Sequence, residues 1–172
     1  PYRRFMARRF ARVVCDIDGV PVALYNVHLE TYGADKPWDD DALRDATDRR
    51  SRVRDFLQTY RLAIASRENQ AWVVRKRLEE EPLPFILLGD FNATRHQHVY
   101  REIAAGYSDV CVGLSWLEGG TYHTALPLVT IDFIITSKHF RTEDCRIVDL
   151  SVSDHRPQFA SIVFLHPPQR PQ

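Results

Sequence analysis

A chain of 172 residues is long enough for one domain with a hydrophobic core and too short for two of ordinary size. Its 23 lysine and arginine residues balance 23 aspartate and glutamate residues, so the domain as a whole lacks the net positive charge typical of an indiscriminate nucleic-acid binder, and a nucleic-acid substrate is neither excluded nor favoured. No apolar run approaches the roughly 20 residues that a membrane helix needs. The sequence therefore predicts a single soluble domain, without indicating where in the cell it resides.

The first predicted element is a β-hairpin. Residues 11–17 and 20–29 are β-rich runs joined by Asp18-Gly19, a pair suited to a tight turn in which both central residues need positive φ. Alternation in the second strand sets the polar residues Asn26, His28 and Glu30 on one face and apolar residues on the other. A histidine is thus expected at the strand's end among polar neighbours.

A long helix follows in the sequence pattern. Asp39-Asp40-Asp41 favours a helix N-cap, and Pro82 and Pro84 end the helical pattern. The pattern weakens near Ser66, where a break is an alternative to one continuous helix. Apolar residues recur at helical spacing and predict one stripe: Val53, Phe56, Leu57, Tyr60, Ile64, Ala71, Val74 and Leu78.

The second half of the chain reads as short strands and turns. Residues 85–88 form an uninterrupted apolar run, typical of a central strand covered on both faces. The later elements are a helix over 97–105, a strand over 129–136, a β-rich piece over 145–150, a turn over 153–157, a strand over 159–165 and a Pro-rich tail, expected to be disordered, over 166–172. Three widely spaced cysteines (Cys15, Cys111, Cys145) fit neither a disulfide framework nor a CxxC metal site, so we expect buried thiols.

Polar residues stand where buried strands end, and these are the candidate chemistry. In Gly89-Asp90-Phe91-Asn92 a carboxylate and a carboxamide lie two residues apart and share a side. Asp90 can accept a proton or contact a cation, and Asn92 can donate to a phosphoryl oxygen without adding charge. The alternative is an Asx-turn that merely caps the strand.

Asp132 lies within the apolar strand Thr130–Ile135, where an unpaired charge would cost several kcal/mol, so it must have a partner. His155, in the turn Ser153–Pro157, is the candidate. A dyad of Asp132 and His155 would fix the imidazole tautomer as a general base requires. Asp154 would remain to bind a hard cation such as Mg²⁺.

Five motifs, in order, carry a resemblance to a known family. They are Asn26-Val27-His28-Leu29, Arg67-Glu68-Asn69-Gln70, Gly89-Asp90-Phe91-Asn92, Ile131-Asp132-Phe133 and Ser153-Asp154-His155-Arg156-Pro157. Together they resemble the endonuclease/exonuclease/phosphatase superfamily, with its deoxyribonuclease-I-like fold, over about residues 8 to 165. The resemblance implies an α/β sandwich of two packed, mainly antiparallel sheets flanked by helices, and Mg²⁺-dependent phosphoester hydrolysis, with Mn²⁺ as an alternative ion.

The resemblance also implies residue roles. His28 corresponds to the histidine near the leaving group or phosphate, and Asp90 and Asn92 to the pair that orients the nucleophile. Asp132 and His155 correspond to the catalytic pair, and Asp154, with Asp90, to the metal ligands. Substrate contacts are expected from Arg95 and His96, directly after the Asp90 motif, and from Arg156, for which pairing with a neighbouring acid is the alternative.

The sequence departs from the family pattern at its start. Members carry an Asn strand and a Glu strand, the latter holding the metal, well upstream of the His28 strand, and neither is recognisable here. We therefore expect residues 1–165 to form a partial domain. The missing segment, with any anchor or signal, would be supplied in cis or by another chain, and the fragment alone would be inactive.

The function remains open between classes. The leading hypothesis is a hydrolase acting on a nucleic acid, an inositol phosphate or a lipid headgroup. The rival is a catalytically inactive remnant of the fold that serves as a binding or scaffolding module. A zinc hydrolase built on His96 and His98 is a third class, for which no neighbouring Cys or carboxylate completes a site.

Overall fold

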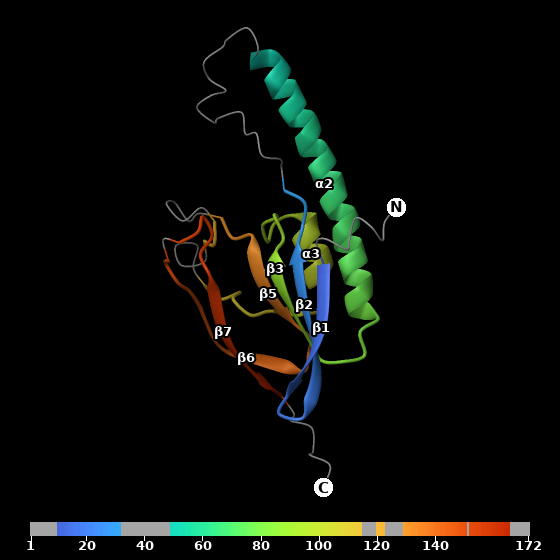
Figure 1. Ribbon diagram of the computed structural model, residues 1–172, viewed down its shortest axis with the longest axis vertical. Helices are drawn as coiled ribbons and strands as arrows, with labels where there is room; N and C mark the ends of the chain where they lie inside the picture. Colours follow the sequence, from blue (N-terminus) through green and yellow to red (C-terminus); the bar gives the residue numbers. More distant parts are fainter. Residues whose placement is uncertain (1–9, 32–48, 115–119, 123–128, 151, 166–172) are drawn as a thin grey trace.

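The computed structural model describes residues 10–31, 49–114, 120–122, 129–150 and 152–165. Within these ranges the chain forms a five-stranded sheet of order β1-β2-β3-β5-β4 and a two-stranded sheet of β6 and β7. Two helices, α2 and α3, accompany the sheets (Figure 1). The architecture is therefore the mixed α/β arrangement that the sequence predicts.

The N-terminal hairpin is confirmed. Strands β1 (Phe10–Ile17) and β2 (Val20–His28) pair antiparallel along their length, from Phe10 opposite Val27 to Ile17 opposite Val20. The turn residues Asp18 and Gly19 have φ of 55° and 85°, the left-handed conformations that a two-residue hairpin requires. The alternation in β2 is confirmed as well, with Val27 buried and His28 exposed.

The remaining strands of the large sheet extend from β2. Strand β3 (Phe85–Asp90) pairs parallel with β2, so a crossover is needed, and α2 supplies it. Strand β5 (Asp132–Thr136) pairs antiparallel with β3, and the short β4 (Ser108–Asp109) pairs with β5. Helix α3 (His98–Ala104) connects β3 to β4. The expected strand over 129–136 is thus three residues shorter, because Val129 instead bridges to Tyr122.

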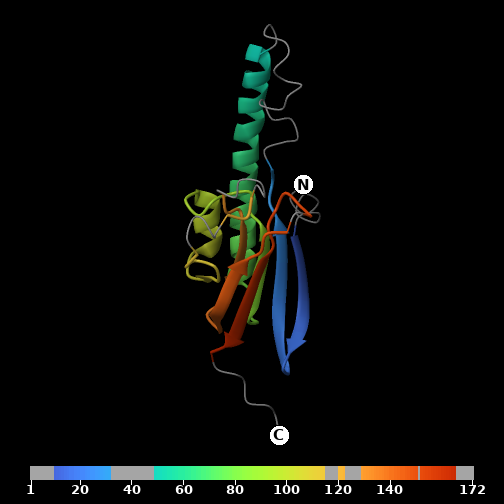
Figure 2. The same cartoon turned by 90° about the vertical axis from the view of Figure 1, so that its left-hand side faces the viewer.

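Helix α2 (Arg49–Glu79) is one continuous helix, without a break near Ser66. Its C-terminal half packs on the sheet through a stripe at helical spacing: Ala63, Arg67, Gln70, Ala71, Val74 and Leu78. Its N-terminal half extends beyond the sheet (Figures 1 and 2), which leaves Val53 and Leu57 exposed instead of packed. The expected N-cap at Asp39–Asp41 lies outside the described residues.

Two hydrophobic cores lie on opposite faces of the five-stranded sheet. Alternate residues of β2, β3 and β5 pack with α2 and α3 on one face, and the residues between them pack with β6 and β7 on the other. In β3, for example, Leu87 belongs to the helix-side core and Ile86 to the other. The result is three layers, helices, large sheet and small sheet, with the small sheet visible in front of the large one in Figure 2.

The small sheet and the cysteines require two corrections. Strand β6 spans Phe140–Ile147, earlier than the expected piece over 145–150, and β7 spans Gln158–Phe164. Cys111 and Cys145 form a disulfide, so the expectation of buried thiols is wrong for this pair, and only Cys15 is free. The disulfide joins the segment after β4 to β6, a spatial proximity that a sequence separation of 34 residues conceals.

The helices within the described ranges contain no stretch that is both long and apolar enough to span a bilayer. The Pro-rich tail over 166–172 lies outside the described residues.

Candidate active site

Three adjacent strands place a polar residue at the same level of the large sheet. His28 is the register partner of Asp90 in the parallel pair β2–β3, and Asp90 is the partner of Asp132 in the antiparallel pair β3–β5. Directly paired residues have their side chains on the same face of a sheet. The pairing therefore sets an imidazole and two carboxylates in a row across three strands.

The alternation of side chains decides which face this row occupies. Leu87 and Phe133 face the helices. Leu88 and Asp90 lie one and three residues from Leu87, and Asp132 lies one residue from Phe133, so these three side chains face the small sheet. His155 comes from the turn that precedes β7 of that small sheet. The two layers thus bring Asp132 and His155 together from opposite sides.

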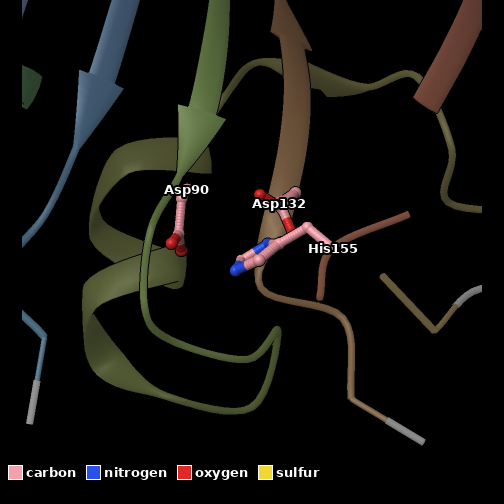
Figure 3. Close-up of side chains that lie close together, drawn as sticks. All are labelled: Asp90, Asp132 and His155. Carbon is pink, nitrogen blue, oxygen red and sulfur yellow. The ribbon is translucent and has the colours of Figure 1, made fainter. Parts of the chain in front are cut away.

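Asp132 and His155 form a hydrogen bond of 2.9 Å between Oδ2 and Nδ1. The partner that the apolar surroundings of Asp132 require is therefore the imidazole. Figure 3 shows the ring of His155 reaching from Asp132 toward Asp90, with the Asp90 carboxylate turned into the same space. The ligand atoms of Asp90, Asp132 and His155 all lie within 4.8 Å of one another.

The loop after β3 holds the Asp90 carboxylate in place. Asn92, at φ 47°, donates its backbone N–H to Asp90 Oδ1 at 2.7 Å and its side-chain amide to Oδ2 at 3.2 Å. The same amide donates to the carbonyl of Leu29 at 3.0 Å. The Asx-turn considered for this motif is present, and it orients the carboxylate toward the cluster.

Gly89 is required by the close approach of β2. It has φ 148°, and a Cβ at this position would lie 1.9 Å from the carbonyl oxygen of Val27. Any side chain would push β3 away from β2 and separate the two polar strand ends. The glycine of the Gly89–Asn92 motif therefore sets the spacing of the site.

Two groups of the cluster, Asp90 and His155, have raised pKa values. Burial raises the pKa of Asp90, and the charge of Asp132 adds to the rise, although the Asn92 amide and the two histidines oppose it. Burial alone would lower the pKa of His155, but the hydrogen bond and charge of Asp132 outweigh it, and the pKa of His155 rises. Two acids and one base thus share a partly buried site with an excess of negative charge.

Two buried polar residues of α2 support the loops of the site. Arg67, 1% exposed, donates to the carbonyl of Asn92 at 2.6 Å. The side chain of Gln70 accepts a hydrogen bond from the backbone N–H of Glu30 at 2.9 Å, just beyond the end of β2. Arg67 and Gln70 therefore hold the segments that carry the site.

The other candidate residues lie around the cluster at different distances from it. His28 is mostly exposed, with Nε2 3.7 Å from Asp90 Oδ2. Asp154 is exposed and lies outside the group of closely spaced ligand atoms found among the described residues, though its charge contributes to the raised pKa of His155. His96 and His98 are exposed and join no such group within the described ranges.

The two candidate arginines have protein partners. Arg95 donates to Asp109 Oδ2 at 2.8 Å and to the carbonyl of Cys111 at 3.2 Å. Arg156 donates to Asp149 Oδ2 at 2.9 Å, the pairing with an acid that the sequence left open. Neither contact occupies every donor of a guanidinium, so substrate binding by these residues stays a prediction.

Residues that sequence reasoning missed lie behind the dyad. Thr121 Oγ1 accepts from the backbone N–H of Ile131 and of Asp132 at 3.1 and 3.3 Å, and Gln158 donates to the carbonyl of Asp132 at 2.9 Å. A buried hydroxyl in a loop has no distinctive spacing, so the sequence carries no signal for this contact.

An open groove of about 490 Å³ borders the dyad and is lined by Leu88 and Ile134 of the large sheet together with the turn before β7.

The protein is therefore a mixed α/β domain that holds a cluster of two carboxylates and one imidazole at the ends of its strands, between the two sheets. The chain belongs to the Endonuclease/Exonuclease/phosphatase family, which matches residues 14–155. No curated protein matches the chain.

Solved structures share the fold at low sequence identity. An endonuclease/exonuclease/phosphatase from Beutenbergia cavernae has a TM-score of 0.62 at 16% identity, with 90% of this chain and 39% of that chain covered. A mannosyl-6-phosphatase from Bacteroides thetaiotaomicron has a TM-score of 0.56 at 18% identity, covering 90% and 56%. The human nocturnin catalytic domain has a TM-score of 0.53 at 18% identity, covering 91% and 61%. The chain therefore spans about half the length of these structures.

Proposed function

We propose that this chain carries part of the active site of a divalent-metal-dependent phosphoester hydrolase. The observation that supports it best is the cluster of Asp90, Asp132 and His155, whose ligand atoms lie within 4.8 Å of one another beside an open groove. Titratable groups with shifted pKa values that converge in a groove are characteristic of catalytic sites. Membership of the Endonuclease/Exonuclease/phosphatase family supports phosphoester hydrolysis as the reaction.

The donor set fits a hard divalent cation. Asp90 supplies carboxylate oxygen, and the exposed carboxylate of Asp154 lies in the turn beside His155. Mg²⁺ and Mn²⁺ prefer such oxygen ligands. Burial and repulsion from Asp132 raise the pKa of Asp90, and the attraction of a bound cation would offset both effects by stabilising the charged carboxylate. When bound, the ion would stabilise the negative charge that develops on phosphoryl and leaving oxygens.

The Asp132–His155 pair would transfer the proton during hydrolysis. Asp132 accepts from Nδ1 of His155, which fixes the neutral ring as the Nδ1–H tautomer and leaves Nε2 to take or give a proton. His28, whose Nε2 lies 3.7 Å from Asp90, would donate a hydrogen bond to a phosphoryl group, and Asn92, whose amide already donates to Asp90 and Leu29, would hold Asp90 in place. The groove beside Asp132 would hold the rest of the substrate.

We further propose that activity needs polypeptide beyond these 172 residues. The chain spans 39% to 61% of the three structures compared with it. Strand β7 pairs only with β6 among the described residues, so its other edge can accept a further strand next to the groove. A segment pairing there would bring an additional carboxylate to the metal site. The substrate remains a phosphoester of a nucleic acid, an inositol phosphate, a sugar or a lipid headgroup.

The test is hydrolysis of two chromogenic esters, p-nitrophenyl phosphate and bis(p-nitrophenyl) phosphate. The 172-residue chain should show little turnover with Mg²⁺ or Mn²⁺, and co-expression with the preceding part of its open reading frame should restore it. Asp90→Asn should abolish the restored activity, whereas Asp144→Asn, an exposed acid of β6, should retain it. Vigorous metal-dependent turnover by the 172-residue chain would contradict the need for a further segment. A restored chain that binds a phosphoester without cleaving it would favour the binding-module alternative.

A further inference from the structure

Thr121 and Tyr122 together contact both sides of the Asp132–His155 dyad. Thr121 is fully buried, at 0% exposure, although it is a polar residue in a loop. A buried hydroxyl without a partner would be unfavourable, so its contacts indicate what it does.

The side chain of Thr121 holds the first member of the dyad. Its Oγ1 accepts hydrogen bonds from the backbone N–H groups of Ile131 and Asp132, at 3.1 and 3.3 Å. These are the two residues at which the chain enters β5. The carbonyl of Ile131 is in turn bonded to the N–H of Phe91 at 2.8 Å, so the entry to β5 is held from both sides.

The backbone of the same residue holds the second member. The carbonyl of Thr121 accepts the N–H of Arg156 at 2.8 Å, directly after His155. Tyr122 forms a bridge with His155, and the centroids of the two rings lie 4.9 Å apart. Asp132 belongs to the large sheet and His155 to the turn before the small sheet, so these two residues join the layers at the dyad.

The structure assigns Thr121 as a positioning residue of the dyad: its hydroxyl fixes Asp132 and its carbonyl fixes the His155 turn, which sets the 2.9 Å hydrogen bond between them. Thr121 does not touch the reacting atoms. Its effect on catalysis rests on the proposed function, but its effect on the imidazole can be measured without substrate or metal.

The experiment is ¹⁵N NMR of the His155 ring at a pH where the imidazole is neutral. Bonding to Asp132 selects the Nδ1–H tautomer, whereas free histidine favours the opposite one. In Thr121→Val the ratio of Nδ1–H to Nε2–H should fall by about tenfold, the equivalent of one ordinary hydrogen bond. Thr121→Ser, which keeps the hydroxyl, should restore the ratio.

The matched control is Ser137→Ala. Ser137 Oγ accepts from the N–H of Phe85 at 3.1 Å, a similar buried contact at the far end of the same strand pair. This variant should lose thermal stability without changing the His155 tautomer. A tautomer shift in Ser137→Ala equal to that in Thr121→Val would reduce Thr121 to a general structural role, and an unchanged ratio in Thr121→Val would overturn the proposal.

Hydrogen exchange keeps the proposal testable should Thr121→Val fail to fold. In the unmodified chain the amide of Asp132 should exchange as slowly as that of Phe85, because both donate to a hydroxyl within the same sheet. Exchange of Asp132 at the rate of an exposed amide would contradict the assignment. Neither measurement depends on hydrolysis, so a restored chain that stays inactive while His155 keeps its tautomer would refute the proposed function and leave the role of Thr121 intact.

Discussion

The large sheet carries two polar clusters whose charges are arranged in opposite ways. In the first, Glu81 bonds to Arg12 at 2.7 and 2.9 Å and accepts a hydrogen bond from Tyr25, so its carboxylate, 2% exposed, is fully matched by donors. In the second, Asp90 and Asp132 share the partly buried imidazole of His155, and the other nearby imidazole, His28, is mostly exposed and 3.7 Å from Asp90. The negative charge of Glu81 is thus neutralised by Arg12, whereas the cluster of Asp90, Asp132 and His155 contains more carboxylates than cationic partners.

The pKa values follow this difference. The Arg12 hydrogen bond lowers the pKa of Glu81 from 4.5 to about 2, despite the opposing effect of burial. Burial and the neighbouring Asp132 raise the pKa of Asp90. The fold stabilises the charged form of Glu81. The charged form of Asp90 is instead destabilised, and a bound cation would offset that effect. The contrast separates a structural cluster from the proposed metal site within one sheet.

The largest expected effect concerns the dyad. In the restored chain of the proposed hydrolase, His155→Ala and Asp132→Asn should each lower kcat by on the order of 100-fold or more, because each removes the oriented imidazole. The two changes should be strongly non-additive in a double-mutant cycle on kcat/KM. Additive losses would mean that Asp132 and His155 act separately.

Thermal melting of the same variants adds a second readout. His155→Ala leaves the Asp132 carboxylate without its imidazole and should lower the melting temperature. Asp132→Asn removes a charge that also repels Asp90, so it should lower the melting temperature less than His155→Ala does. The reverse order would show that Asp132 is held by a stronger partner than His155.

The structural cluster should matter for stability instead. Glu81→Gln should lower the free energy of unfolding by about 2 kcal/mol at neutral pH, the range of a hydrogen bond to a charged group, reduced because Arg12 is partly exposed. Glu79→Gln is the control, since Glu79 forms only exposed pairs within α2 and should change stability little. Urea unfolding measures both, and equal losses would contradict the comparison.

The pH dependence of this effect has a defined sign. The folded pKa of Glu81 is depressed, so its stabilisation is complete above 4.5 and is lost as the pH falls toward about 2. The difference between the unmodified chain and Glu81→Gln should therefore shrink over that window. A difference that stays constant down to pH 2.5 would mean that the charge of Glu81 contributes nothing.

The smallest effect on stability is expected for Asp90. Asp90→Asn should change the free energy of unfolding by less than about 1 kcal/mol, because removing an unfavourable charge offsets the weaker hydrogen bonds to Asn92. Its stability should also depend less on pH than that of the unmodified chain, which gains stability as the pH falls through the raised pKa of Asp90. A loss as large as that in Glu81→Gln would identify Asp90 as structural.

Local features of the fold could be predicted from the sequence because short-range chemistry determines them. Asp18-Gly19 specifies a hairpin turn, and the apolar run before Asp90 specifies a central strand. Asp132 in an apolar strand demanded a partner, and His155 provides it. Each of these inferences needs only the residue, its neighbours and one physical constraint.

Features that depend on distant segments could not be predicted in the same way. The disulfide between Cys111 and Cys145 depends on how the two sheets meet, and the buried hydroxyl of Thr121 depends on a loop with no periodic pattern. The stripe of α2 predicted packing throughout, but the sheet is too short to cover Val53 and Leu57. Spacing along the chain carries no information about the reach of the neighbouring layer.

The most direct test of the metal site is paramagnetic broadening by Mn²⁺ in ¹H–¹⁵N spectra of the 172-residue chain. Added ion should broaden the amides of Asp90, Asp132 and His155 first, because that cluster has the excess of acid, and should spare those around Glu81, whose charge is matched. Asp90→Asn should remove the broadening, and Glu81→Gln should leave it unchanged. Broadening centred on other acids, or none at millimolar Mn²⁺, would contradict a metal-binding role for this cluster.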